Sequence, residues 1–337
     1  MKDLSSLKNL PHYPVMLKEV LSLCVPQKGG QFIDCTFGSG GYTNAILSFP
    51  KTKVIALDRD LHTEEFVNST KKNYKNRFIF YNQKFSELDK VIKKDTKVDC
   101  IIFDLGISSL QISDLSRGFS FNSKERPDMR MGLNYLSAHE VINNFDLKTL
   151  NDILRLFGEE KDSLRIAKNI IRERKKKLIS SIPELVAIIK KSKKREFKKK
   201  INITTKTFQA IRIFVNKEIS ELIEGLINAT KLLKTGGTII VVSFHSIEDK
   251  IVKFFFNNYS KNKSKGSRYY PDLDGEQNLF ENYKNKVIKP SEEEINLNNR
   301  SRSAKLRFVT RSKNDFFYPD EFKKKFLHYL ELENRYV

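Results

Sequence analysis

The sequence predicts an α/β protein in which a mostly parallel sheet is interrupted by a helical insertion. Short apolar runs that end in an acidic or small polar residue recur along the chain, and helical patterns separate them. This alternation stops between about residues 113 and 202, where only helical patterns occur. A length of 337 residues suits two structural units or one enlarged domain. We predict a sheet domain from 1–112 and 203–337 and a helical domain from 113–202.

Four predicted strands precede the insertion, at 31–37, 54–58, 78–81 and 98–104. The first is followed by the glycine cluster Gly38-Ser-Gly-Gly41 and a helical pattern from Tyr42 to Leu47. A polar helical pattern at 63–75 separates the second strand from the third. Strands joined through helices form parallel sheets with right-handed crossovers.

The insertion carries helical patterns at 147–157 and 164–171 and a proline near a further helix start, Pro183. Residues 161–200 contain sixteen Lys or Arg and four acidic residues, so more than half of the net charge of +21 lies there. A field of this strength favours a polyanionic partner, nucleic acid first. The alternative is that a biased base composition scatters Lys over solvated surfaces.

The sheet pattern resumes after the insertion. A long amphipathic helix is predicted through Phe208 to Leu226, ending near 235–237, and the most strand-like run of the chain follows at 238–243. A helix then runs through Phe256. Residues 257–299 form a polar excursion, and 304–310 are the last predicted strand.

Composition excludes several classes of protein. No apolar run reaches the roughly 18 residues of a membrane span, and residues 1–23 lack the apolar core of a secretory signal, so we expect a cytoplasmic protein. Three separated cysteines exclude a disulfide framework and a Cys-x-x-Cys metal site. The histidines lack metal-ligand spacing, and we predict no catalytic metal.

Two strand-terminal acids and a glycine turn define the candidate site. The turn Gly38 to Gly41 places backbone N–H groups at a helix start, where an anionic group binds. Asp58 follows Gly38 by 20 residues at the end of the second strand, where a carboxylate accepts hydrogen bonds from a ribose diol. Thr43 stands where a Gly-x-Gly-x-x-Gly motif requires glycine, so a nicotinamide oxidoreductase fits poorly. The fourth strand brings Asp104 to the same edge.

His245 follows the strongest strand and is expected at the same sheet edge as Asp104, as an acid, a base or a phosphate contact. Arginine and aromatic residues at 117–121 and 126–130 suit phosphate binding and base stacking. From their spacing alone, a loop packed by its own Phe and Met side chains is the favoured explanation of these residues.

Several segments together resemble one family. They are His12-Tyr-Pro-Val-Met-Leu-Lys-Glu19, Asp34-Cys-Thr-Phe-Gly-Ser-Gly-Gly41, Asp104-Leu-Gly-Ile-Ser-Ser-Leu-Gln111, Arg117-Gly-Phe-Ser-Phe121, Asp128-Met-Arg-Met131, Gly158-Glu-Glu160, Thr207-Phe-Gln-Ala-Ile-Arg-Ile213 with Val215-Asn216, Ser243-Phe-His-Ser246 with Glu248-Asp249, and Arg302-Ser-Ala-Lys-Leu-Arg307. From about His12 to Thr310 the chain is similar to the bacterial RsmH (MraW) family. That family comprises S-adenosylmethionine-dependent methyltransferases that modify N4 of a cytidine in the decoding region of 16S ribosomal RNA.

The resemblance implies a class I methyltransferase fold, Rossmann-like, with a seven-stranded sheet and a helical domain inserted after the fourth strand. It also implies cofactor contacts at seven positions, Gly40, Gly41, Tyr42, Asp58, Phe85, Asp104 and Gln111. Tyr42 stands where the family more often has His, Cys35 replaces a usual Gly, Leu110 a usual Pro, and Arg126-Pro127 a usual Pro-Leu. None of these departures removes a charged group from the predicted site.

For the reaction we nominate Asp104 and the loop 106–109 as acceptors for the amino protons of cytosine, with His245 second. The target base is single-stranded or flipped, and Lys175 to Lys177 with Lys193 to Lys200 hold the surrounding backbone of 16S RNA within the small ribosomal subunit. A DNA amino-methyltransferase and a non-catalytic ribosome-assembly factor remain as alternatives. The sequence leaves open whether the protein is a monomer or a homodimer.

Overall fold

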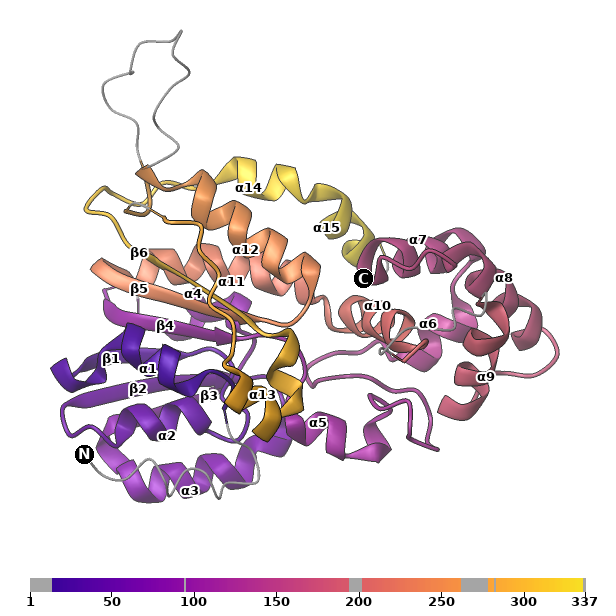
Figure 1. Cartoon of the computed structure of the whole chain (residues 1–337), viewed down its shortest axis with the longest axis horizontal. Helices are drawn as coiled ribbons and strands as arrows, with labels where there is room; N and C mark the ends of the chain where they lie inside the picture. Colours follow the sequence, from indigo (N-terminus) through magenta and orange to yellow (C-terminus); the bar gives the residue numbers. More distant parts are fainter. Residues whose placement is uncertain (1–13, 94, 194–201, 262–277, 282, 336–337) are drawn as a thin grey trace, which may run out of the picture. The chain divides into compact units, whose positions relative to one another are not determined.

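The computed structural model describes residues 14–93, 95–193, 202–261, 278–281 and 283–335, which form two compact units. Unit 1 is drawn from residues 1–106 and 221–325, and unit 2 from 107–220 and 326–337. Figure 1 shows the sheet in the first unit and a group of helices in the second.

Unit 1 is built on a six-stranded sheet in the order β3-β2-β1-β4-β5-β6. Its strands are β1 (Gly30–Asp34), β2 (Thr52–Asp58), β3 (Phe78–Asn82), β4 (Val98–Asp104), β5 (Leu233–Ser243) and β6 (Lys305–Thr310). The first five are parallel, and β6 runs antiparallel to β5. The α/β class and each predicted strand are confirmed.

The expected seventh strand does not appear among the described residues. The described residues that pair next to β6 form only isolated bridges, Phe280 with Arg311 and Ile288 with Leu306. Between them Asn285 has a φ of 49°, which interrupts an extended backbone. The described residues beside β6 therefore form isolated bridges and no seventh strand.

Helices cover both faces of the sheet of unit 1 (Figure 1). They are α1 (Leu17–Cys24), α2 (Gly41–Leu47), α3 (Glu64–Tyr74), α4 (Leu88–Val91), α11 (Glu218–Leu232), α12 (Ser246–Asn258), α13 (Glu292–Leu297) and α14 (Asp320–Lys325). Phe32, Ile102 and Val242 face a core shared with α1 and α2, since alternate strand residues point to one side. On the other side, the ring of Phe103 lies where α11 passes closest at Gly225.

The described residues of unit 2 form helices and connecting loops, with no strand among them. The unit contains α5 (Ser109–Ser113), α6 (Ala138–Asn144), α7 (Leu147–Gly158), α8 (Ser163–Arg174), α9 (Ile182–Ser192), α10 (Thr205–Asn216) and α15 (Leu327–Asn334). Pro183 lies in the first turn of α9, as predicted. Phe157 of α7 packs on Phe214 of α10 and on Tyr329 of α15. These contacts place α10 and α15 in the helical unit, although both lie outside the predicted 113–202 insertion.

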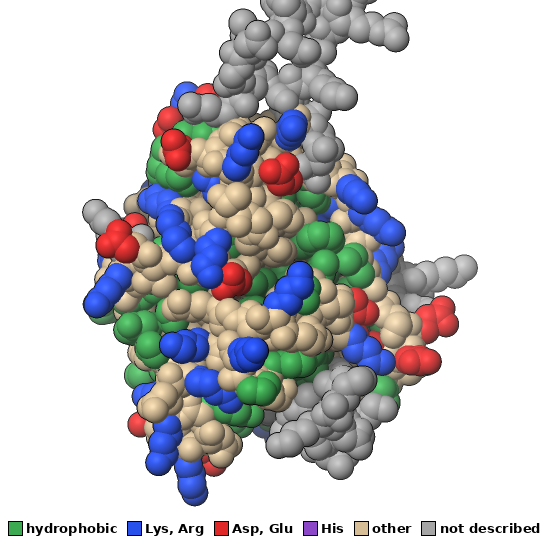
Figure 2. Space-filling model, turned by 90° about the vertical axis from the view of Figure 1, so that its left-hand side faces the viewer, with side chains coloured by type: hydrophobic (Ala, Val, Ile, Leu, Met, Phe, Trp, Pro, Cys, Tyr) green, Lys and Arg blue, Asp and Glu red, His purple; other side chains and the backbone are tan. Residues whose placement is uncertain are grey.

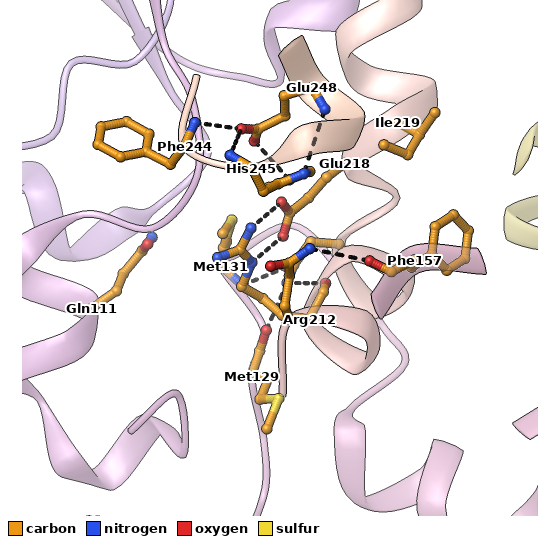
Figure 3. Close-up of polar contacts among 12 residues, drawn as sticks. Gln111, Met129, Met131, Phe157, Arg212, Glu218, Ile219, Phe244, His245 and Glu248 are labelled. Atoms are coloured by element: carbon orange, nitrogen blue, oxygen red, sulfur yellow. Dashed lines mark hydrogen bonds and ion pairs between the residues drawn. The ribbon is translucent and has the colours of Figure 1, made fainter. Parts of the chain in front are cut away.

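The single long helix predicted through Phe208 to Leu226 is wrong, because the chain breaks between α10 and α11. Lys217 has a φ of 49°, and its backbone N–H bonds back to Phe214. Arg212 reaches across the break and donates two hydrogen bonds of 2.7 Å to Glu218 (Figure 3). The second helix, α11, ends at Leu232 and not near 235–237 as predicted, and β5 begins at the next residue.

Among the described residues, no helix has both the length and the apolar character that a membrane crossing requires.

Candidate active site

The glycine turn after β1 requires its glycines for steric reasons. Gly38 and Gly40 have φ values of 54° and 80°, which favour glycine. A Cβ at Gly40 would lie 2.8 Å from the amide nitrogen of Asn44, and one at Gly41 would lie 2.8 Å from Pro14. Glycine is therefore required at these positions by the backbone angles and by close packing against Asn44 and Pro14.

Asp58, at the end of β2, is tied to this turn. Its Oδ2 accepts a hydrogen bond of 2.7 Å from the Gly38 N–H, and its Oδ1 accepts one of 2.9 Å from the Asp60 N–H. Burial raises the pKa of Asp58 to about 6, against the lowering effect of these two donors. Asp58 is thus hydrogen-bonded to the glycine turn, and its contact with a ribose remains a prediction.

Asp34, at the end of β1, anchors the other side of the turn. Its carboxylate accepts hydrogen bonds from the Thr36 N–H at 3.2 Å and from the Thr43 hydroxyl at 2.7 Å. The side chain is fully buried, and this burial raises its pKa to about 6. Asp34 therefore joins the strand end to the first turn of α2. The sequence analysis gave it no role beyond the motif that contains it.

Asp104, at the end of β4, carries a buried oxygen with no hydrogen-bond partner among the described residues, Oδ1. Burial, followed by the charges of Asp34, Glu248 and Glu294, raises the pKa of Asp104 well above its usual range. The Tyr42 hydroxyl bonds to this carboxyl and opposes the rise in pKa. An unsatisfied buried carboxyl is costly, and such groups concentrate where a ligand or a reaction uses them.

Tyr42 lies in α2 and is only 3% exposed. Its hydroxyl contacts the backbone carbonyl of Val15 as well as the Asp104 carboxyl. Burial raises the pKa of Tyr42 well above its usual value, and the neighbouring carboxylates add to this rise. Tyr42 is therefore a neutral phenol that links the segment before α1 to the end of β4.

Two further carboxylates face this region, and the sequence analysis did not select either as a site residue. Glu19 of α1 has a buried oxygen, Oε2, with no hydrogen-bond partner in the described part of the chain. Glu294 of α13 accepts a hydrogen bond of 2.7 Å from the Met16 N–H, and burial followed by the charge of Glu19 raises its pKa. Glu19 ends the first motif of the resemblance, which was an available signal. Glu294 lies in the polar excursion and carried no signal.

His245 is committed to the start of α12. Its Nδ1 accepts a hydrogen bond of 3.4 Å from the Glu248 N–H, and its Nε2 lies 3.1 Å from Glu248 Oε1 (Figure 3). Glu248 in turn accepts a hydrogen bond of 2.8 Å from the Phe244 N–H. Because Nδ1 is an acceptor, the proton of a neutral ring lies on Nε2 and faces the Glu248 carboxylate. His245 and Glu248 thus form a capping box.

The other two predicted cofactor residues differ in their surroundings. Phe85 packs edge-on against Phe103, with ring centroids 5.4 Å apart, and its ring occupies the space beside Gly225. Gln111 belongs to unit 2, where its Oε1 accepts a 3.0 Å hydrogen bond from the Ser108 N–H in the capping box of α5. The structure therefore gathers the glycine turn, Tyr42, Asp58 and Asp104 in unit 1 and places Gln111 in the other unit.

The predicted RNA-gripping lysines divide into three groups. Lys176 and Lys177 are exposed and pair with Glu173 and Glu184. Lys193 is only 9% exposed, pairs with Glu160 and donates to the Ile203 carbonyl, so it stabilises the helical unit instead. Residues 194–200 lie outside the described residues. Figure 2 views the molecule from the left-hand side of Figure 1, and on this face Lys and Arg side chains are more frequent than Asp and Glu.

Comparison with known proteins identifies the family. Residues 9–312 match the MraW methylase family. The chain belongs to this family. A relative from Ehrlichia canis, named ribosomal RNA small subunit methyltransferase H, is 43% identical over 302 residues that cover 88% of this chain and 99% of the relative. The protein of the same name from Rickettsia typhi is 44% identical over 299 residues, 88% of this chain and 97% of that one.

Among solved structures, a putative rRNA methylase from Clostridium thermocellum is similar with a TM-score of 0.38 and 14% identity, over 88% of this chain and 97% of that one. The family membership confirms the resemblance read from the motifs. The chain is therefore a member of a methyltransferase family.

Proposed function

We propose that this protein transfers a methyl group from S-adenosylmethionine to N4 of a cytidine in the decoding region of 16S ribosomal RNA, within the small ribosomal subunit. The names of its relatives, ribosomal RNA small subunit methyltransferase H, support ribosomal RNA as the substrate. The single structural observation that carries the proposal is the buried, unpartnered oxygen of Asp104 at the carboxyl end of β4. Ligands of open α/β sheets bind at that edge.

The residues of unit 1 fit the proposed cofactor. The glycine turn lies at the start of α2, where backbone N–H groups suit an anionic group, Asp58 has the place in the sheet that suits ribose hydroxyls, and Phe85 offers an aromatic ring for the adenine. Gln111 of the helical unit remains a proposed contact. The carboxyl groups of Asp34, Asp104, Glu248 and Glu294 make an electronegative environment. Such an environment favours a cation.

When bound, S-adenosylmethionine supplies an electrophilic methyl group on a positively charged sulfur. Asp104 accepts a hydrogen bond from the amino group of cytosine and holds its nitrogen lone pair toward the methyl group. After the N–C bond forms and the S–C bond breaks, the nitrogen has a surplus proton, and the Asp104 carboxylate takes it. A carboxyl with a raised pKa is a better proton acceptor once it is ionised.

We assign His245 to positioning. Its Nδ1 accepts the Glu248 N–H, and its Nε2 lies 3.1 Å from Glu248 Oε1 without a hydrogen-bond partner among the described residues. The capping box instead fixes the turn between β5 and α12, and Glu248 contributes to the charge that acts on Asp104. The backbone of the loop 106–109 remains a second proposed acceptor for the amino protons.

The test is mass spectrometry of ribosomal RNA nucleosides. Small subunits from a strain without the enzyme are incubated with this protein and S-adenosylmethionine, and N4-methylcytidine is expected. Asp104→Asn should lose the product, whereas Asp95→Asn, the same change at an exposed position, should retain it. Absence of N4-methylcytidine with active wild-type protein would overturn the proposal. Product formation on DNA in a competition assay would favour a DNA amino-methyltransferase.

A non-catalytic assembly factor predicts a different outcome. The wild-type protein would then leave every nucleoside unmodified while it still bound small subunits. Retained methylation in Asp104→Asn would assign the proton acceptor to another group, first the loop 106–109.

A further inference from the structure

A groove lies between α8 and α9 in unit 2, apart from every residue discussed for methyl transfer. Its volume is about 390 Å³, within the range of pockets that hold small ligands. Leu178, Ile179, Ala187 and Ile188 supply its apolar wall. Charged side chains complete the lining with Arg172, Lys176, Lys177 and Lys191, together with Glu173 and Glu184.

The loop that closes the groove is held in one conformation. Asn143 of α6 binds Ile179 twice, accepting from its N–H at 2.9 Å and donating to its carbonyl at 3.0 Å. Arg174 donates to the carbonyls of Ile142 and Phe145 at 2.7 and 2.6 Å. A groove that is already formed loses little conformational entropy when a ligand enters it.

The two helices are also tied together beside the groove. The Asn169 amide of α8 donates a hydrogen bond of 2.7 Å to the Ser192 hydroxyl of α9, which in turn donates to the Ile188 carbonyl. Glu184 accepts from the Ser180 and Ser181 N–H groups at the start of α9. The spacing of the helices is therefore set by buried or partly buried contacts and does not depend on the cationic side chains of the rim.

Charge determines what the groove accepts. Its lining contains four cations and two carboxylates, and it belongs to the stretch 161–200 with sixteen basic and four acidic residues. Arg172, Lys176 and Lys177 are more than half exposed, so each can exchange its present carboxylate partner for a phosphate. Leu178 is 59% exposed at the same groove, which leaves apolar surface for a planar base.

We propose that this groove binds one unstacked nucleotide of the ribosomal RNA other than the methylated cytidine, with its base against the apolar wall and its phosphate on Arg172 and Lys191. The inference rests on the proposed function, since it takes ribosomal RNA as the substrate. A single-stranded or bulged nucleotide exposes its base and its phosphate at once, whereas paired RNA offers mainly its backbone. The groove thus selects irregular RNA, and it adds a second point of recognition to the flipped target base.

The test uses the salt dependence of binding. A fluorescent single-stranded RNA oligonucleotide is titrated with full-length protein at several salt concentrations. Each phosphate contact contributes about 0.7 to the slope of log affinity against log salt for single strands. Arg172→Ala and Lys191→Ala should each reduce the slope by about that amount, and the double variant by about twice as much. Lys148→Ala, a change at an exposed lysine of α7, should leave the slope unchanged.

A second variant tests the apolar wall without removing a cation. Ala187→Glu places a carboxylate in the groove at an exposed helical position that tolerates Glu. It should weaken RNA binding at every salt concentration. Thermal unfolding of each variant shows whether the helical unit remains folded.

Outcomes for the groove and for the catalytic proposal are separable. Methylation by the Arg172→Ala/Lys191→Ala variant should show a raised KM for small subunits, with kcat and the affinity for S-adenosylmethionine unchanged. An unchanged salt slope in the double variant overturns the groove proposal and leaves the methylation result standing. Weaker binding to small subunits with unchanged binding to the oligonucleotide also overturns it, in favour of a protein contact. If the wild-type protein does not methylate RNA but the groove variants still reduce the slope of log affinity against log salt, the proposed function is refuted and the groove proposal stands.

Discussion

Asp34 is the residue whose substitution tests the electrostatics of unit 1 most directly. It is fully buried at the end of β1, and its neutral isostere in Asp34→Asn keeps an oxygen for the Thr36 N–H. The new amide can donate to the Thr43 hydroxyl, which donates to Asp34 in the wild-type protein. The perturbation therefore removes a charge and changes little of the packing.

The magnitude follows from the pKa of Asp34, which rises from 3.8 to about 6 on folding because the carboxyl is buried. Between these two values the folded state holds a proton that the unfolded state has lost, so the free energy of unfolding falls as the pH rises. The full pKa shift lowers the free energy of unfolding by about 3 kcal/mol, and this loss is complete above pH 6. Asp34→Asn should therefore be more stable than wild type at pH 7.5 and lose much of this advantage at pH 4.5.

The assay is urea unfolding of wild type and Asp34→Asn at a series of pH values from 4.5 to 7.5, with the exposed Asp95→Asn as the matched control. Burial also raises the pKa of Asp58 to about 6, of Glu333 to about 8 and of Asp104 well above its usual range, so a decline in stability with pH should remain in Asp34→Asn and be smaller than in wild type. The control should follow the wild-type curve.

The same substitution should alter the pH dependence of methylation. After burial, the charge of Asp34 is the largest cause that raises the pKa of Asp104. Without that charge Asp104 ionises at lower pH, and the acid limb of the kcat profile should move to lower pH. Two results together would refute the assignment of a buried, interacting carboxylate to position 34. They are a curve of stability against pH for Asp34→Asn that parallels wild type, and an acid limb of the kcat profile that does not move.

Three further substitutions have defined outcomes. Tyr42→Phe removes the hydroxyl that lowers the pKa of Asp104, so the acid limb of the pH–rate profile should move to higher pH, opposite to Asp34→Asn; an acid limb that stays in place would contradict the contact. Asn216→Ala leaves the buried Met131 N–H and Met129 carbonyl without their partners and should cost about 3 kcal/mol in urea unfolding, whereas a loss below 1 kcal/mol would show that water replaces the amide. Burial raises the pKa of Glu333 from 4.5 to about 8, so wild-type stability should fall as the pH rises through that window, and Glu333→Gln should show a smaller fall. Circular dichroism melts at pH 5 and pH 8.5 measure the difference, and equal pH dependence in both proteins would count against the shift.

The sequence by itself determined the elements whose signals are local. Apolar runs of strand length, separated by helical patterns, were sufficient to identify β1 to β6 and the acids Asp58 and Asp104 at two of their ends. The glycine turn was readable for the same reason, because only glycine adopts its backbone angles without strain. The motifs, read in order along the chain, were sufficient for the family.

Only the tertiary structure decided which distant side chains share an environment. The helix breaks at Lys217 although its periodicity supports a continuous helix, and the Asn216 amide and the Arg212–Glu218 pair make long-range or break-spanning contacts at this point. Glu19 and Glu294 reach the surroundings of Tyr42 from segments separated by about 270 residues, which no local pattern encodes. Burial and the field of neighbouring charges depend on the folded packing of the whole unit, so the raised pKa values of Asp34 and Asp104 exist only in three dimensions.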